Sequence, residues 1–141
     1  MAISYHPELG EALWCDYSGV QPEMIKRRLA VVLTPRSCQR AGLTTVIPIS
    51  CTPPRIPRPW HVKLSKDPYP KGDKEEVWAK CDMINVVSFE RLSGYHIRWN
   101  GRRQYLKMRV SMEELVRIRK GVLASLGFAD GASNSADGRS L

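Results

Sequence analysis

The order of hydrophobic and polar residues predicts a chain built mainly of short β-strands. Five segments carry apolar residues at every second position or in unbroken β-branched runs, which are the patterns of half-buried and fully buried strands. Glycine, proline and polar residues separate the segments and mark the turns. The predicted strands cover residues 12–17, 26–34, 43–50, 60–64 and 77–83.

Alternation in the last of these strands places a cation and a carboxylate side by side. The odd-numbered residues of 77–83 are apolar and form the expected core face, so Trp78, Lys80 and Asp82 face the other way. Lys80 and Asp82 are then roughly 6 to 7 Å apart, by the rise of a strand. The pair is either a salt bridge on a solvated face or an acid–base pair, and the sequence leaves both open.

Prolines shape the connection between the third and fourth strands. Pro48, inside strand 43–50, indicates a sheet edge or a bulge. Residues 51–59 hold four prolines, which remove hydrogen-bond donors and fix φ. We therefore expect a stiff, extended loop there, and Arg55 and Arg58 make it positively charged.

A hairpin and a helix follow the predicted strands. Asn100-Gly101 is a strong hairpin signal between aromatic and basic residues, which suit either cross-strand packing or stacking on bases. Ser111 and Glu114 have the spacing of a capping box, and one apolar stripe predicts a helix that ends at Gly127. The stripe comprises Leu115, Ile118, Val122, Leu123 and Leu126.

These elements indicate one mainly β domain over residues 1–128. A chain of 141 residues buries roughly two-thirds of its unfolded surface, so it needs no metal or disulfide to fold. Residues 129–141 contain almost nothing apolar and are expected to form a disordered tail.

The cysteines indicate neither a metal site nor a disulfide framework. They show no ligand spacing, and each lies beside apolar residues, so we interpret all of them as small core residues. No metal or cofactor is expected. No apolar run approaches the ~20 residues of a membrane span and no secretion signal is visible, which favours a cytoplasmic protein with reduced thiols. The cysteines are Cys15, Cys38, Cys51 and Cys81.

The positive charge is concentrated in one block. The formal net charge is +8, and no carboxylate occurs between Glu23 and Asp67. Such a block favours an anionic partner, either a nucleic acid or an acidic protein segment, over a membrane, because no basic amphipathic helix accompanies it. The basic residues of the block are Lys26, Arg27, Arg28, Arg36, Arg40, Arg55, Arg58, Lys63 and Lys66.

Several motifs in order resemble the MazF/PemK family of toxin–antitoxin toxins over about residues 8–127. They are 14–17 (WCDY), 26–35 (KRRLAVVLTP), 46–50 (VIPIS) and 80–82 (KCD), followed by the helix. The resemblance implies a small SH3-like antiparallel β-barrel with a C-terminal α-helix. It also implies a homodimer, metal-independent cleavage of single-stranded RNA, and neutralisation by an acidic antitoxin protein.

The resemblance also assigns residues to the expected site. The family's active-site arginine falls on Arg28 and its hydroxyl residue on Ser50. The basic-x-acidic pair of the Kid-like branch falls on Lys80 and Asp82, and Glu23 matches an acidic residue of the first loop. The expected RNA-binding residues are Lys26, Arg27, Arg55, Arg58, Trp60, Lys80 and Thr52.

The sequence departs from the family pattern at two positions. Leu29 follows Arg28 where the family usually has Arg-Pro, which changes the entry of the strand but removes no chemistry. Pro22 stands where the Kid-like branch has a histidine, which puts that histidine's role in doubt here.

The residue types suit RNA cleavage through the 2′-hydroxyl. The planar guanidinium of Arg28 matches a phosphate and would stabilise the charge on a pentacovalent intermediate. Ser50 would hydrogen-bond the phosphate or hold the 2′-oxygen in line. The base is either Glu23 or Asp82, and the sequence does not choose between them.

Two other functions fit parts of the pattern. A non-catalytic RNA- or DNA-binding SH3-like barrel would use the same positive face and aromatic residues. A topoisomerase poison, like the related CcdB branch, would share the fold. Arg28 and Ser50 speak against the poison, because a protein target needs no phosphate clamp.

Overall fold

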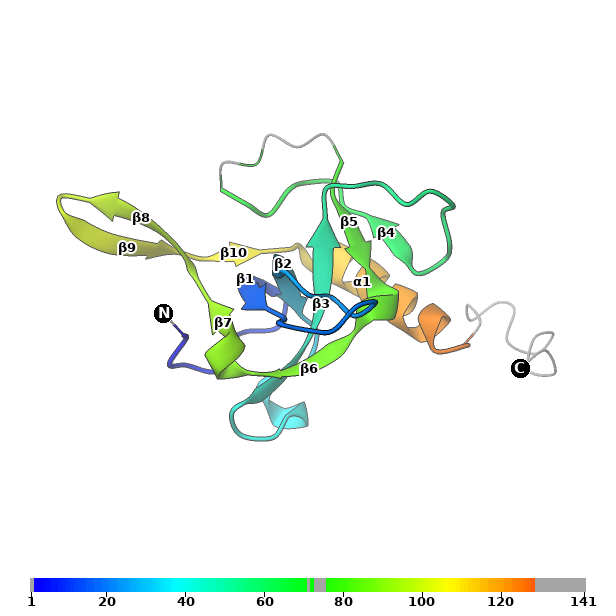
Figure 1. The fold of residues 1–141 in the computed structure, drawn as a ribbon, viewed down its shortest axis with the longest axis horizontal. Helices are drawn as coiled ribbons and strands as arrows, with labels where there is room; N and C mark the ends of the chain where they lie inside the picture. Colours follow the sequence, from blue (N-terminus) through cyan, green and yellow to red (C-terminus); the bar gives the residue numbers. More distant parts are fainter. Residues whose placement is uncertain (1, 71, 73–75, 129–141) are drawn as a thin grey trace.

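Short strands and one C-terminal helix make up the computed structural model, which describes residues 2–70, 72 and 76–128 (Figure 1). The helix is α1 (Met112–Ser125), and short 3-10 helices are η1 (Arg36–Cys38), η2 (Cys81–Met83) and η3 (Phe89–Arg91). The strands are β1 (Glu11–Asp16), β2 (Arg27–Val32), β3 (Leu43–Ser50), β4 (His61–Lys63), β5 (Trp78–Lys80), β6 (Asn85–Ser88), β7 (Leu92–Ser93), β8 (Tyr95–Trp99), β9 (Arg102–Leu106) and β10 (Met108–Arg109).

The main sheet is antiparallel and curled, and α1 packs against η2 and β4 at one end of it (Figure 1). Its strand order is β10-β1-β2-β3-β5-β4, while β6 pairs with β3 and β7 pairs with β1. The end strands β10 and β4 do not pair with each other in the described chain, so the sheet forms a half-barrel. The mainly β class with a C-terminal helix is therefore confirmed. The expected tail, residues 129–141, lies outside the described residues.

Two hydrophobic clusters lie on the two faces of this sheet. Odd-numbered residues of β2 and β3 point to the larger cluster, which also receives the buried side chains of α1. Even-numbered residues of β2 and β3 point to the smaller cluster with residues of β1. The larger cluster includes Leu29, Val31, Ile47, Ile49, Leu115, Ile118 and Val122, and the smaller one includes Leu13, Cys15, Ala30, Val32 and Val46. Residue parity therefore tells which face a side chain of β2 or β3 occupies.

Pro48 is buried inside the sheet, so the expectation of a sheet edge is wrong. On one side of β3, Pro48 faces Ala30 of β2. On the other side, the pairing with β6 ends at Val46 and the pairing with β5 begins at Ile49. The residue without an N–H donor therefore lies where one neighbouring strand gives way to the next.

The predicted strand 77–83 is wrong beyond Lys80. The ladder stops there, and Cys81 begins the 3-10 helix η2. Cys81 packs beneath α1 so closely that a Cβ on Gly121 would lie 2.8 Å from its Sγ, so the chain turns under the helix. Lys80 and Asp82 consequently do not share a strand face, and Asp82 is exposed.

Helix α1 begins with half of the predicted capping box. The Ser111 Oγ accepts a hydrogen bond from Glu114 N at 3.1 Å. The Glu114 carboxylate does not return to Ser111; it accepts bonds from Ser65 N at 2.6 Å and Ser65 Oγ at 3.0 Å. This contact fastens the first turn of α1 to the segment after β4.

The apolar stripe of α1 is narrower than predicted. Leu115, Ile118 and Val122 are buried, whereas Leu123 and Leu126 are 50% and 60% exposed. Each residue turns the helix by about 100°, so Leu123, which directly follows the buried Val122, points away from the covered face. Leu123 and Leu126 therefore belong to the predicted stripe but not to the part of it that packs on the sheet.

Only two of the four cysteines are core residues. Cys15 and Cys81 are buried, and burial raises the pKa of Cys15 to about 11 and that of Cys81 to about 12. Cys38 in η1 and Cys51 directly after β3 are exposed, so the interpretation of these two as core residues is wrong. Both lie in connections, where an apolar neighbour in sequence need not be a neighbour in space.

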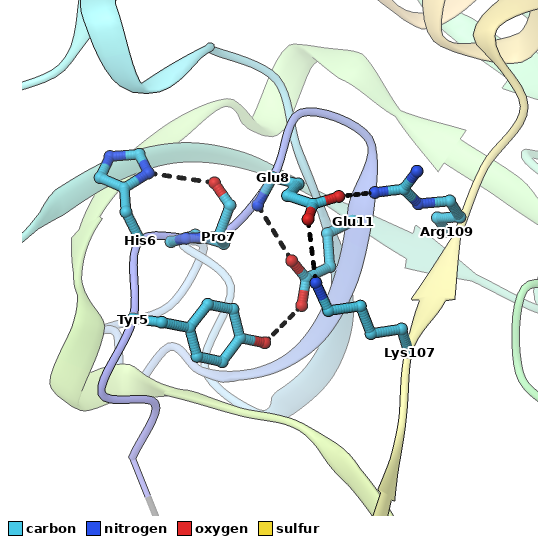
Figure 2. A network of polar contacts seen from close by, with 7 residues as sticks. All are labelled: Tyr5, His6, Pro7, Glu8, Glu11, Lys107 and Arg109. Atoms are coloured by element: carbon cyan, nitrogen blue, oxygen red, sulfur yellow. Dashed lines mark hydrogen bonds and ion pairs between the residues drawn. The ribbon is translucent and has the colours of Figure 1, made fainter.

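A network of polar side chains fixes the N-terminal segment to β1 and β10 (Figure 2). The carboxylate of Glu11, 1% exposed, accepts bonds from Tyr5 OH at 2.5 Å and Glu8 N at 2.9 Å. Glu8 in turn binds Lys107 at 3.0 Å and also Arg109. Burial and the bond to Glu11 raise the pKa of Tyr5, and Lys107 and Arg109 lower the pKa of Glu8. Each carboxylate of this corner therefore has protein partners.

Candidate active site

Residues at the ends of β2, β3 and β5 occupy one face of the sheet. The last pair of β2 and β3 joins Ala30 to Pro48, and Arg28 and Ser50 each lie two residues beyond it, so each is on the same face of its strand as its member of that pair. Trp78 of β5 is paired with Ser50 from the other side. Because even-numbered residues of these strands share a face, Arg28, Ser50, Trp78 and Lys80 point to the same side of the sheet. We call these four residues the Arg28 face.

The Arg28 face contains donors that lack a protein acceptor. Arg28 Nε and Trp78 Nε1 are buried, and neither has a hydrogen-bond partner among the described residues. Ser50 is 6% exposed, and its hydroxyl oxygen accepts a bond from Thr52 N at 3.1 Å. A serine hydroxyl that accepts in this way still has its own proton to donate. Three donors, one of them permanently charged, suit an anionic ligand such as a phosphate.

The loop between β1 and β2 adds a carboxylate beside Arg28. Glu23, Lys26 and Arg28 line one depression of about 620 Å³. Glu23 Oε1 accepts a bond from Val20 N at 3.0 Å, which holds the carboxylate within its own turn. A Cβ at Gly19 would lie 2.4 Å from Met24 O, so only glycine allows this loop to close so tightly.

Three comparisons with known proteins show the family and the fold of the chain. Residues 8–119 match the family model of the PemK-like, MazF-like toxin of type II toxin–antitoxin systems. The chain belongs to this family. An uncharacterized protein of Haemophilus influenzae is 34% identical, over 89% of this chain and 96% of its own.

Solved structures share the fold of this toxin at low sequence identity. MazF from Deinococcus radiodurans superposes with a TM-score of 0.62 at 20% identity, over 88% of this chain and 99% of that one. An endoribonuclease in complex with its cognate antitoxin, from a mycobacterial species, superposes with a TM-score of 0.61 at 16% identity. That match covers 89% of this chain and 99% of the other.

Asp82 of the toxin does not line the depression beside Arg28. It is exposed in η2, two residues past Lys80, and the two make no ion pair. Within residues 2–70, 72 and 76–128, the ion pairs join Lys63 to Glu76 and Glu8 to Lys107 and Arg109. Of the two carboxylates predicted as the base, only Glu23 lines a depression with Arg28.

Two predicted RNA-binding residues lie on the opposite side of the sheet. Arg27 points away from Arg28, and its guanidinium lies 4.6 Å from the centroid of the Trp14 ring. It also donates a long bond of 3.5 Å to Ser93 Oγ. Trp60 packs against the larger core cluster. The structure therefore does not bring Arg27 or Trp60 to the Arg28 face.

The proline-rich loop begins directly at this face. Thr52, Arg55 and Arg58 are exposed between Ser50 and β4. Arg58 N donates to His61 Nδ1 at 3.0 Å, and His61 is paired with Lys80 across β4 and β5. The loop thus starts and ends beside strands that carry the Arg28 face.

Trp78 was missed as a candidate site residue. Alternation had already placed it on the face of Lys80, so its position was predictable. The sequence does not reveal that the indole N–H is buried without a partner among the described residues. Its burial depends on how β2, β3 and β5 come together.

Neither a metal cluster nor a membrane helix is found in the described part of the toxin. No group of three or more His, Cys, Asp or Glu residues there is arranged to hold a metal ion. None of the described helices is long and apolar enough to cross a membrane.

Proposed function

We propose that this toxin is an endoribonuclease that cleaves single-stranded RNA without a metal ion. In the proposed reaction, the 2′-hydroxyl gives its proton to a base as its oxygen bonds to the neighbouring phosphorus. The bond from phosphorus to the 5′-oxygen breaks, and that oxygen leaves as a hydroxyl after taking a proton from water, which gives a 2′,3′-cyclic phosphate. The observation that carries the proposal is the shared face of Arg28 and Ser50, with donors that have no acceptor within residues 2–70, 72 and 76–128. Membership of the toxin family supports it, as does the likeness to a mycobacterial endoribonuclease.

Arg28 and Ser50 would stabilise the charge that develops on the phosphate. As the 2′-oxygen attacks, negative charge grows on the non-bridging oxygens, where the Arg28 guanidinium and the Ser50 hydroxyl donate hydrogen bonds. Donors already held in place need no reorganisation during the reaction, and removing one commonly costs on the order of 3 kcal/mol of barrier. Trp78 Nε1 is a third donor on this face, and Lys80 adds a positive charge.

Glu23 is our choice for the base that removes the 2′-proton. It lines the depression that Arg28 also lines, whereas Asp82 does not. A base must come within hydrogen-bond reach of the proton that it removes, so proximity to the phosphate donor is the first criterion. Comparing Glu23→Gln with Asp82→Asn in the same cleavage assay tests the choice. A larger loss in Asp82→Asn would overturn it.

The partners proposed for the toxin follow from its surface and its relatives. The basic residues 26–66 suit messenger RNA and an acidic antitoxin segment, and a mycobacterial structural neighbour is bound to its cognate antitoxin. Apolar side chains exposed along α1 and just beyond it suit a protein partner, which we propose to be a second copy of the toxin. They are Met112, Val116, Leu123, Leu126 and Phe128. An mRNA substrate would place the toxin in the cytoplasm.

The test is cleavage of single-stranded RNA in EDTA by the purified protein, beside the Arg28→Ala variant. Wild type should produce fragments with 2′,3′-cyclic phosphate ends, and RNA methylated at every 2′-oxygen should stay intact. Arg28→Ala should cleave on the order of 100-fold more slowly.

Intact RNA of varied sequences with both proteins would overturn the enzyme proposal. Salt-dependent RNA binding without any product would then favour the non-catalytic barrel. Growth arrest with intact RNA and damaged DNA would favour a topoisomerase poison.

A further inference from the structure

The β8–β9 hairpin extends away from the half-barrel (Figure 1). The two strands form their own two-stranded sheet, joined by a tight turn in which Asn100 and Gly101 have φ of 51° and 75°. This confirms the predicted hairpin. Tyr95 is buried at its base, Ile97 and Leu106 are half-buried, and the remaining strand residues are exposed. Core packing therefore explains the base of the hairpin but not the chemistry of its tip.

The tip carries positive charge that the protein itself does not neutralise. Between Glu90 and Glu113 the sequence contains no carboxylate. Nearer the barrel, Lys107 and Arg109 each form an ion pair with Glu8. The unmatched cations are at the tip, where no described residue forms an ion pair with Arg98, Arg102 or Arg103.

The cross-strand register sets these cations beside each other and beside exposed rings. Arg98 is directly opposite Arg103, and like charges in that position destabilise a hairpin. Trp99, 64% exposed, is paired with Arg102, and Tyr105 is 51% exposed. The lining of a shallow depression at the tip includes Trp99, Arg102 and Arg103. An isolated two-stranded hairpin is at best marginally stable. The facing arginines and the exposed rings do not add to its stability.

We propose that the tip of the β8–β9 hairpin is a second binding surface for single-stranded nucleic acid, separate from the Arg28 face. Arg98, Arg102 and Arg103 would contact successive phosphates, and the Trp99 indole would stack on a base. Base–aromatic stacking next to arginines is the usual means by which proteins hold single strands regardless of sequence. An acidic peptide would use the charges but would have no flat base for the exposed indole, so nucleic acid fits the combination better.

The inference takes from the proposed function only the substrate class, single-stranded RNA. It adds a surface that binds RNA outside the cleavage site. A strand held there would raise the local concentration of its other nucleotides at the Arg28 face. Loss of the surface should therefore raise KM for long RNA and leave kcat unchanged.

The test measures binding of a fully 2′-O-methylated RNA oligonucleotide, which cannot be cleaved through its 2′-oxygens, by fluorescence anisotropy across a salt series. The variants are the triple change Arg98→Gln, Arg102→Gln and Arg103→Gln, and the single changes Trp99→Ala and Trp99→Phe. The matched control replaces two exposed cations of α1, Arg117→Gln and Lys120→Gln. Thermal unfolding checks that each variant is folded.

The triple variant should lower the slope of log K against log salt by about 2, since each single-strand phosphate contact contributes about 0.7. Trp99→Ala should weaken binding about tenfold, and Trp99→Phe should restore most of it. The α1 control should behave like wild type.

Hairpin variants that match the α1 control in slope and affinity would overturn the inference, even if wild type cleaves RNA. Hairpin variants that keep RNA binding but lose binding to polyglutamate would also overturn it, because the tip would then be a protein-docking surface. A wild-type protein that binds no single-stranded RNA would overturn both this inference and the proposed function.

Discussion

The carboxylates of the N-terminal corner and the donors of the Arg28 face differ in whether the protein supplies their hydrogen-bond partners. In the corner, the buried carboxylate of Glu11 is bonded to Tyr5 and Glu8, and Glu8 is matched by Lys107 and Arg109 (Figure 2). On the Arg28 face, Arg28 Nε and Trp78 Nε1 are buried and have no acceptor among the described residues.

The difference separates polar groups that stabilise the fold from polar groups that suit a ligand. A buried group with all its bonds contributes to stability, whereas a buried group without a partner costs roughly 1–3 kcal/mol. A fold that tolerates this cost at two donors on one face, next to the Ser50 hydroxyl with its own proton to donate, suits an anion that would supply the acceptors. Substitutions should therefore damage stability in the corner and activity on the Arg28 face.

The largest expected effect is that of Arg28→Ala on cleavage. We expect a loss on the order of 100-fold, from about 3 kcal/mol of barrier, and a change in unfolding free energy of no more than about 1 kcal/mol. Arg27→Ala should slow cleavage less than tenfold, since that guanidinium rests on Trp14 on the opposite face. Cleavage rates and urea unfolding of both variants measure the contrast. Equal losses of cleavage in Arg28→Ala and Arg27→Ala would show that only the positive charge of residues 26–66 matters, and not the face on which each arginine lies.

The next effect is a loss of stability in the corner. Glu11→Ala removes the acceptor of Tyr5 OH and Glu8 N and should lower the unfolding free energy by about 1.5–3 kcal/mol. Cleavage per folded molecule should not change, because Glu11 does not line the depression beside Arg28. Urea unfolding and RNA cleavage in the same preparation give both values. An unchanged stability with slower cleavage would reverse the roles assigned to the two regions.

Thiol labelling offers a more moderate contrast within the wild-type protein. Cys51 follows Ser50, whereas Cys38 lies in η1 at the other end of β3, and both are exposed. A 2′-O-methylated RNA should slow the alkylation of Cys51 several-fold and leave Cys38 unaffected, as mass spectrometry of the labelled peptides would show. Cys15 and Cys81 should resist labelling in both cases, because they are buried and their pKa values are raised. Equal protection of Cys38 would place the RNA elsewhere.

The smallest expected effect is the pH dependence of stability that arises from Glu8, on the exposed side of the corner. Lys107 and Arg109 lower the pKa of Glu8 below its ordinary value of 4.5, so the ionised form favours folding. The contribution is present above about pH 4.5 and is lost as the pH falls through the lowered pKa of the folded state. Urea midpoints should therefore separate wild type from Glu8→Gln at pH 7 and converge at pH 3. Equal midpoints at both pH values would remove Glu8 from the stabilising network.

Local patterns in the sequence predicted the elements better than they predicted the contacts between them. The alternation around β1, β3 and β4 and the Asn100-Gly101 turn gave elements that the structure contains. Strand 77–83 failed because Cys81 turns under Gly121, a close contact between residues forty positions apart that no local pattern reveals.

The candidate site divides in the same way. Parity within a strand separates Arg28 from Arg27, and the family resemblance pointed to Arg28 and Ser50. The depression that Glu23 and Arg28 both line depends on the path of the loop between β1 and β2. The lack of a described partner for the Trp78 indole N–H depends on which groups the fold places around it. Neither could be predicted from residue spacing.

The most direct test of the central claim is a heteronuclear NMR titration of the wild-type toxin with a 2′-O-methylated single-stranded RNA. We expect the side-chain signals of Arg28 Nε–H and Trp78 Nε1–H to shift as the RNA supplies their missing acceptors, while the backbone amide signal of Glu8, whose N–H is already bonded to Glu11, stays in place. RNA binding that leaves the Arg28 and Trp78 signals unmoved would contradict the claim.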